Sequence, residues 1–164
     1  MLSLTRLLRF ALTGSLLALT ACASLPGRLP PGTSIDAVRH GGLFGPSDEF
    51  VLPGGGSRLE FAQGKTTWML DFDATGRLTT SQQVLTEANL RNVALGSTEA
   101  EVRQRYGRAA TTYPIGYQHR HVWTYRFDDA DCVWYQILFD DATGRVVESS
   151  PGPDPACDGP SDRG

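Results

Sequence analysis

The sequence predicts an α+β protein made of two tandem units, each with one or two short helices packed on an antiparallel β-meander. Three observations carry this prediction. The segment Asp73–Arg77 recurs letter for letter as Asp141–Arg145. Upstream of each copy, starting at Gly32 and at Gly96, a glycine is followed by two hydroxyl residues and, after three further residues, by a valine. Between these markers lie rows of alternating apolar residues, which are typical of strands. Two matched markers in the same order indicate a duplicated unit.

Each unit is expected to begin with a helix. Ser34 and Thr98 are candidate N-caps, because a side-chain oxygen can accept a hydrogen bond from the first turn of a helix. Thr98 also has a glutamate three residues later, as in a capping box, and Gly107 stands where that helix should end. The first helix should be weaker, since glycines at 41–42 interrupt it. The segment Thr86–Val93 is expected to add one short helical turn.

Strands are expected wherever apolar and polar residues alternate. In the first unit these apolar residues are Leu59 and Phe61, followed by Trp68, Leu70 and Phe72. In the second they are Trp123, Tyr125 and Phe127, followed by Val133, Tyr135, Ile137 and Phe139. The repeated Asp-Ala-Thr-Gly predicts a hairpin turn in each unit, with Gly76 and Gly144 at positive φ.

The first 21 residues are typical of a secretion signal. Two arginines precede an apolar run at residues 10–21, which is too short to span a bilayer. Leu19-Thr20-Ala21-Cys22 resembles the lipobox of bacterial lipoproteins, in which the cysteine thiol is lipidated and the chain is cut just before it. An ordinary signal peptide with a chance cysteine is the alternative. By the same resemblance, Ala23 after the cysteine favours sorting to the outer membrane.

These features divide the chain into five parts. A lipoprotein signal peptide at 1–21 precedes the lipidated Cys22 and a Pro-rich tether at 22–31. The first unit spans 32–84, the second spans 85–149, and a Pro/Gly-rich tail occupies 150–164. Removal of 1–21 takes away two arginines and no acid, so the formal charge changes from −3 to −5. Such an acidic body excludes a generic nucleic-acid binder, and it leaves membrane attachment to the lipid.

The two remaining cysteines, Cys132 and Cys157, are expected to form a disulfide in an oxidising envelope compartment. Such a bridge would hold the tail against the body. Two unpaired buried thiols are the alternative.

The sequence contains no constellation that predicts catalysis, and no catalytic residue or cofactor is expected. His119 and His121 share one face of a predicted strand at a spacing compatible with a metal, but solvent-facing histidines are the simpler interpretation. Carboxylates cluster at Asp128, Asp129 and Asp131, and again at Asp140 and Asp141. Turns are rich in aspartate, so ordinary turn chemistry is expected there rather than a metal or acid/base site.

Trp134 and Leu138 are candidate partner-binding residues. They lie on the strand face opposite the candidate core residues, and exposed tryptophan is frequent in binding hot spots. The alternative is that the tail folds over Trp134 and covers it.

The lipobox, the Gly-Ser/Thr-x-x-x-Val helix start and the aromatic strand pairs before a Phe-Asp-x-x-Gly-Arg turn resemble the BamE (SmpA/OmlA) family. These are small outer-membrane lipoproteins with a helix–helix–sheet fold. The tandem arrangement also resembles the beta-lactamase inhibitor protein, which is built from two such units. The resemblance covers residues 30–149 approximately, and the segment from Val84 to Asn89 is the closest part.

The resemblance implies a protein that is lipid-anchored in the bacterial outer membrane, faces the periplasm and acts by protein–protein contact. Its partner would be a periplasmic or outer-membrane protein, and its role an accessory one in outer-membrane protein assembly or envelope integrity. The tandem form also fits an inhibitor or binder of a periplasmic hydrolase. A metal-binding or enzymatic envelope protein is a third possibility, which depends only on the histidine and aspartate clusters.

The lipobox predicts that the substitution Cys22→Ser abolishes acylation, because it removes the thiol that would carry the lipid. Metabolic labelling with a radioactive fatty acid should mark the wild-type chain and leave the variant unlabelled and unprocessed. Equal labelling of the two chains would contradict the lipoprotein interpretation.

Overall fold

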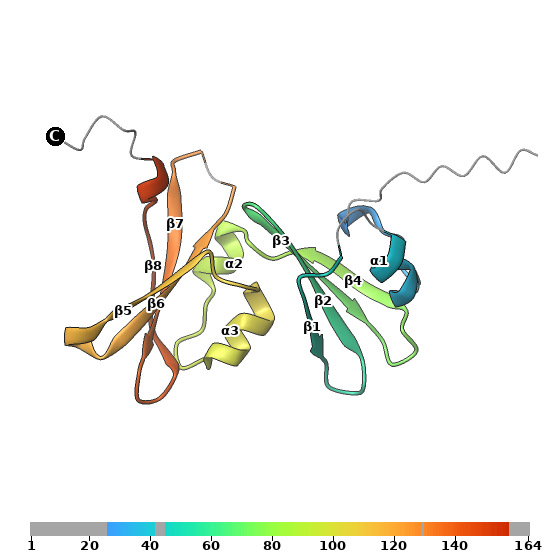
Figure 1. The fold of residues 1–164 in the computed structure, drawn as a ribbon, viewed down its shortest axis with the longest axis horizontal. Coiled ribbons are helices and arrows are strands. Elements are labelled where there is room, and N and C mark those ends of the chain that lie inside the picture. Colours follow the sequence, from blue (N-terminus) through green and yellow to red (C-terminus); the bar gives the residue numbers. More distant parts are fainter. Residues whose placement is uncertain (1–25, 42–44, 129, 158–164) are drawn as a thin grey trace, which may run out of the picture.

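The structure is a computed structural model that describes residues 26–41, 45–128 and 130–157. Within these residues it contains two antiparallel four-stranded sheets in the orders β1-β2-β3-β4 and β5-β6-β7-β8, together with short helices (Figure 1). The predicted α+β class is therefore confirmed. The signal peptide and Cys22 lie outside the described residues. No helix in the described ranges is long and apolar enough to cross a membrane.

In each unit, a helix precedes a four-stranded meander, and among the described residues the second unit has one additional helix. The first unit contains α1 (Ile35–Gly41), β1 (Asp48–Val51), β2 (Ser57–Gln63), β3 (Thr66–Phe72) and β4 (Leu78–Gln83). The second contains α2 (Glu87–Arg91), α3 (Glu99–Tyr106), β5 (Thr111–Ile115), β6 (Arg120–Arg126), β7 (Val133–Asp140) and β8 (Arg145–Pro153). Three 3-10 turns complete the list: η1 (Pro26–Arg28), η2 (Gly116–Gln118) and η3 (Pro155–Cys157). Strand β8 continues through residues 150–153, so the start of the expected tail belongs to the second sheet.

The two sequence markers of each unit contact each other in the structure. In the first unit, the Ile35 N–H at the helix start donates to the Gly76 carbonyl in the hairpin turn, at 2.9 Å. The Gly32 N–H donates to the Leu78 carbonyl at 2.8 Å, and the Arg77 guanidinium donates back to the Gly32 carbonyl at 3.3 Å. The second unit repeats these bonds between Glu99 and Gly144, Gly96 and Val146, and Arg145 and Gly96. The repeated residues therefore dock each helix start on its own hairpin.

The two hairpin turns share their glycine conformation but differ in length. Gly76 and Gly144 have φ angles of 72° and 61°, as predicted. In the first turn, an Asp73 side-chain oxygen accepts hydrogen bonds from the N–H (2.9 Å) and hydroxyl (2.7 Å) of the threonine two residues later. In the second turn, Asp140 does this for the threonine three residues later, at 2.9 and 2.8 Å. The second turn is one residue longer, and the side chain of Asp141 is available for another contact.

The helices α2 and α3 lie between the two sheets, and α1 lies on the far side of the first sheet (Figure 1). The smaller core, between α1 and the first sheet, contains Val38, Leu59, Leu70, Phe72 and Leu78. The larger core is built mainly by α2, α3 and the second sheet, with Leu90, Val102, Tyr106, Tyr125, Tyr135, Ile137, Phe139 and Val146 among its members. Met69 on β3 belongs to this larger core, so the first sheet packs against helices on both faces.

A buried ion pair joins the two units. Glu60 on β2 is 0% exposed, and its carboxylate accepts a hydrogen bond from the guanidinium of Arg103 on α3. The same guanidinium binds Asp48 on β1 at 2.6 Å and lies 5.2 Å from the ring centre of Phe50. The backbone N–H of Arg108 donates to the other Glu60 oxygen at 3.2 Å. A buried carboxylate without such partners would cost several kcal/mol, so these bonds make the junction specific.

The end of α3 fits closely against the first sheet because it carries a glycine. Gly107 has a φ angle of 83°, which favours glycine. A Cβ atom at this position would lie 2.8 Å from the Thr67 side chain and 3.0 Å from the Glu60 carboxylate. Gly107 therefore both ends the helix, as predicted, and allows the two units to approach each other.

Candidate interaction site

The hairpin formed by β5, η2 and the start of β6, residues 111–121, projects from the second sheet on the side away from the first unit (Figure 1). We call it the hairpin arm. Residues 111–114 are exposed, and two tyrosines on the arm are open to solvent, Tyr113 at 37% and Tyr117 at 85%. Aromatic side chains of this kind dominate binding hot spots in protein interfaces. The arm is therefore the candidate interaction site.

The tip of the arm is tied to the rest of the second sheet. His119 has a φ angle of 51°, and its N–H donates to the Gly116 carbonyl at 3.2 Å. Its carbonyl accepts a hydrogen bond from the Asp141 N–H, in the turn between β7 and β8, at 3.0 Å. Tyr117 thus stands on a hydrogen-bonded turn and not on a loop without internal contacts.

His121 connects three elements just below this tip. Its Nδ1 lies 2.8 Å from the carboxylate of Asp141, and its Nε2 lies 3.3 Å from that of Glu99 at the start of α3. Its ring is stacked on Phe139 of β7, with ring centres 5.2 Å apart. This contact to Asp141 is possible because Asp140 takes over the capping role in the longer turn.

The two histidines do not share a strand face, which corrects the sequence prediction. His119 lies in the left-handed turn before β6, and only His121 belongs to the strand. The carboxylates of Asp141 and Glu99 approach opposite nitrogens of the His121 ring, so they do not converge on one point. Across the described ranges, no group of three or more histidine, cysteine, aspartate or glutamate side chains is arranged to hold a metal ion.

The aspartate clusters take separate structural positions. Asp140 caps the second hairpin turn, and the hydrogen bonds from Thr143 lower the pKa of its carboxyl below the ordinary value. Asp128 and Asp131 are exposed between β6 and β7. Asp129 lies outside the described residues.

Trp134 and Leu138 are buried, at 9% and 8% exposed, so the expectation of an exposed contact surface there is corrected. The Arg126 guanidinium lies 5.6 Å from the centre of the Trp134 ring, and Gly152 of β8 lies beside the same ring. Because Gly152 belongs to the segment expected as the tail, this arrangement agrees with the alternative in which the C-terminal segment covers Trp134.

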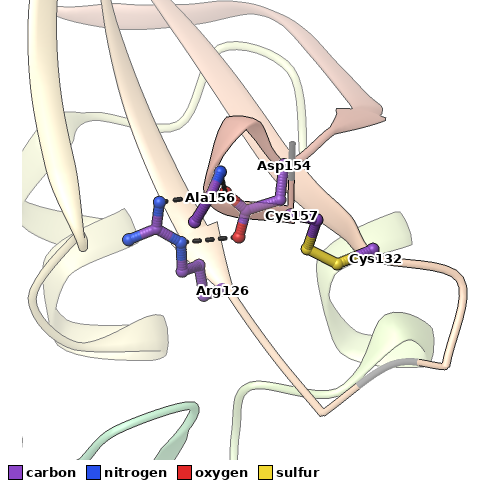
Figure 2. Close-up of a disulfide and its surroundings, with 5 residues drawn as sticks. All are labelled: Arg126, Cys132, Asp154, Ala156 and Cys157. Atoms are coloured by element: carbon purple, nitrogen blue, oxygen red, sulfur yellow. Dashed lines mark hydrogen bonds and ion pairs between the residues drawn. A yellow bond between two sulfur atoms is a disulfide. The ribbon is translucent and has the colours of Figure 1, made fainter. Parts of the chain in front are cut away.

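The C-terminal segment is held by a disulfide and an ion pair (Figure 2). Cys132 and Cys157 are bonded, as predicted, with Cα atoms 6.2 Å apart. Next to this bridge, Arg126 donates to the two carboxylate oxygens of Asp154 at 2.6 and 2.9 Å. The Asp154 N–H donates to the Cys132 carbonyl at 2.9 Å. Residues 154–157 are thereby fixed to β6 and to the loop that follows it.

Sequence reasoning missed the hairpin arm because β5 gives almost no strand signal. Its residues, Thr-Thr-Tyr-Pro-Ile, do not alternate, and Pro114 normally argues against a strand. The structure accommodates this proline because β5 is at the edge of the sheet. The two tyrosines beside Pro114 and Gly116 were the signal that could have indicated an exposed aromatic turn.

Comparisons with protein families, curated proteins and solved structures give no match for this chain. The resemblance to BamE and to the beta-lactamase inhibitor protein therefore depends on the short sequence motifs alone.

Hydrogen bonds from Arg126 lower the pKa of Asp154 below its ordinary value. A lowered pKa stabilises the folded state above the unfolded pKa of about 3.9, and this contribution is lost as the pH falls through the folded pKa. We predict that Asp154→Asn lowers the free energy of unfolding by about 2 kcal/mol at pH 7. The difference should shrink as the pH is lowered from 4 toward 2, which urea denaturation at each pH would measure.

Asp128→Asn is the matched control, because Asp128 is exposed and should change the unfolding free energy little at any pH. A loss for Asp154→Asn that stays constant down to pH 2 would show that the ionised carboxylate is not the source.

Proposed function

We propose that this chain is a lipid-anchored periplasmic protein that acts by binding another protein through the hairpin arm. The observation that carries the proposal is Tyr117, which is 85% exposed on a turn that is hydrogen-bonded to the neighbouring turn between β7 and β8. A large aromatic side chain in water buries apolar area only when a partner covers it.

The bonds that hold the tip reduce the entropic cost of binding. A side chain or loop that is already ordered loses less freedom when it enters an interface. Here the His119 carbonyl and the His121 ring, both bound to Asp141, keep the arm in place before any partner arrives. The arm therefore has the features of a pre-organised contact site.

The position of the arm also suits an anchored protein. The described chain begins with η1, which packs against β3 and β4 of the first unit, and the arm lies at the opposite end of the molecule (Figure 1). A lipid on Cys22 would attach the end near α1 to the outer membrane, and the tether at 22–31 would separate the body from the bilayer. The arm would then point toward a periplasmic or outer-membrane protein.

We infer an accessory role in outer-membrane protein assembly or envelope integrity, on the basis of the family resemblance. The projecting tip favours a second candidate, an inhibitor or binder of a periplasmic hydrolase, because one exposed aromatic on a narrow hairpin can enter a cleft. The identity of the partner distinguishes the two roles. The first requires a component of the assembly machinery, and the second requires a soluble enzyme.

Photo-crosslinking in intact cells tests this proposal. A photoreactive phenylalanine at Tyr117 should capture one envelope protein, which mass spectrometry would identify. The matched control is the same residue at Val51, which is 81% exposed at the end of β1 in the other unit and should capture nothing specific. Tyr117→Ala should weaken binding to the captured partner about thirtyfold, equivalent to ~2 kcal/mol.

Equal capture from the two positions, or unchanged affinity in Tyr117→Ala, would remove the arm as the contact site. Circular dichroism should show that Tyr117→Ala is folded, as expected for an exposed side chain.

A further inference from the structure

The four edge strands of the two sheets are protected unequally against pairing with another chain. Edge strands offer unpaired backbone groups, and proteins commonly block them with charged residues or prolines. In the described residues, three of the four edges carry such features. Strand β1 contains Asp48 and Glu49, β5 contains Pro114, and β8 contains Pro151 and Pro153.

Strand β4 is the exception. Its sequence, Leu-Thr-Thr-Ser-Gln-Gln, contains neither a charge nor a proline. The irregularity in its pairing with β3 comes before Thr80, and residues 80–83 pair regularly. At its start, Leu78 exchanges backbone hydrogen bonds with Gly32 and Thr33, at 2.8 and 2.9 Å. Beyond Leu78, no backbone–backbone hydrogen bond joins residues 79–83 to a segment other than β3 among the described residues. The contact with η1 on this strand is made by a side chain, since the Ser81 hydroxyl donates to the Pro26 carbonyl at 2.8 Å.

A polar cleft of about 200 Å³ lies beside this strand, between the two units. Its wall includes Thr80 and Gln82 from β4, and Asn89, Arg105 and Tyr106 from α2 and α3. Because Thr80 and Gln82 are alternate residues, one face of β4 borders the cleft. A strand added to the edge of β4 would direct every second side chain toward the face of the sheet that borders the cleft.

Arg105 is the cation in this cleft that is available to a ligand. The other arginine in the wall, Arg58, is bound to Asp71 at 2.5 and 2.7 Å and to the Gln104 carbonyl at 3.0 Å. Arg105 is exposed, lies 5.3 Å from the Tyr106 ring centre, and has no carboxylate within salt-bridge distance in the described part of the chain. An exposed arginine that no carboxylate pairs with favours an acidic ligand in this cleft, because a ligand carboxylate would supply the missing counter-charge.

We infer that the edge of β4 binds an extended segment of another protein by adding a strand to the first sheet, with an acidic side chain against Arg105. Main-chain hydrogen bonds would supply sequence-tolerant affinity, and the cleft would select the acidic residue. This inference does not depend on the hairpin arm, which belongs to the other unit.

Hydrogen–deuterium exchange on the full chain in detergent tests this inference, with the synthetic peptide Ac-Thr-Val-Thr-Glu-Thr-Val-Thr-NH2 as the probe. Residues 79–83 should be protected on addition of the peptide, and the edges β1, β5 and β8 should not. A second peptide with Gln in place of Glu should bind about threefold more weakly, as expected for a partly exposed ion pair.

The variant Arg105→Gln should bind the two peptides equally and fold normally, because Arg105 is exposed. Arg91→Gln on α2 is the matched control, since Arg91 is exposed but paired with Glu87, and it should retain the preference for Glu. Tyr117→Ala should also bind the peptides as the wild type does, which separates this site from the hairpin arm.

No protection of residues 79–83 at millimolar peptide would overturn the inference. So would protection in the absence of peptide that increases with protein concentration, since that would mean that two copies pair through β4. Retention of the preference for Glu in Arg105→Gln would overturn the role of the cleft.

Discussion

The burial of one carboxylate, Glu60, is the constraint on which the arrangement of the two units depends. Its oxygens are bound by the Arg103 side chain and the Arg108 backbone, both from the second unit. A buried carboxylate that lost these partners would be costly, so the bonds favour the observed position of α3 on the first sheet. Arg103 also binds Asp48, and Gly107 allows the close approach. Hydrophobic packing also contributes to this contact, since Met69 of the first sheet is buried in the core of the second unit. The ion pair determines how the two surfaces are oriented.

The junction also shows how the duplicated units have diverged. Ser57 pairs with Phe72, and His121 pairs with Phe139, so Thr124 occupies in the second sheet the position that Glu60 occupies in the first. Thr124 is fully buried as well, but it bonds within its own sheet to Thr111. The first sheet thus carries the charge that binds a neighbouring unit, and the second sheet does not. The strands of the second unit that correspond to β1 and β2 are β5 and β6, and these form the hairpin arm.

Local sequence signals predicted the parts of the fold that local chemistry determines. The capping box at Thr98, the glycine turns and the alternating strands are set by residues close in sequence. The junction could not be predicted, because nothing in the sequence around Glu60 indicates that a distant arginine will cover it. Whether Trp134 is exposed or covered was left open for a related reason, since alternation shows that a strand has two faces but not what lies over each. The hairpin arm was missed because Pro114 argues against a strand in the sequence, although an edge strand accommodates it.

Glu60 and Arg103 should therefore hold the two repeated units as one rigid body, with the hairpin arm at one end and the β4 edge in the other unit. Backbone residual dipolar couplings of the weakly aligned full chain measure this directly. One alignment tensor should fit the amides of residues 45–84 and of residues 87–128. Two tensors of different magnitude or orientation would contradict it, because they would show that the units move independently.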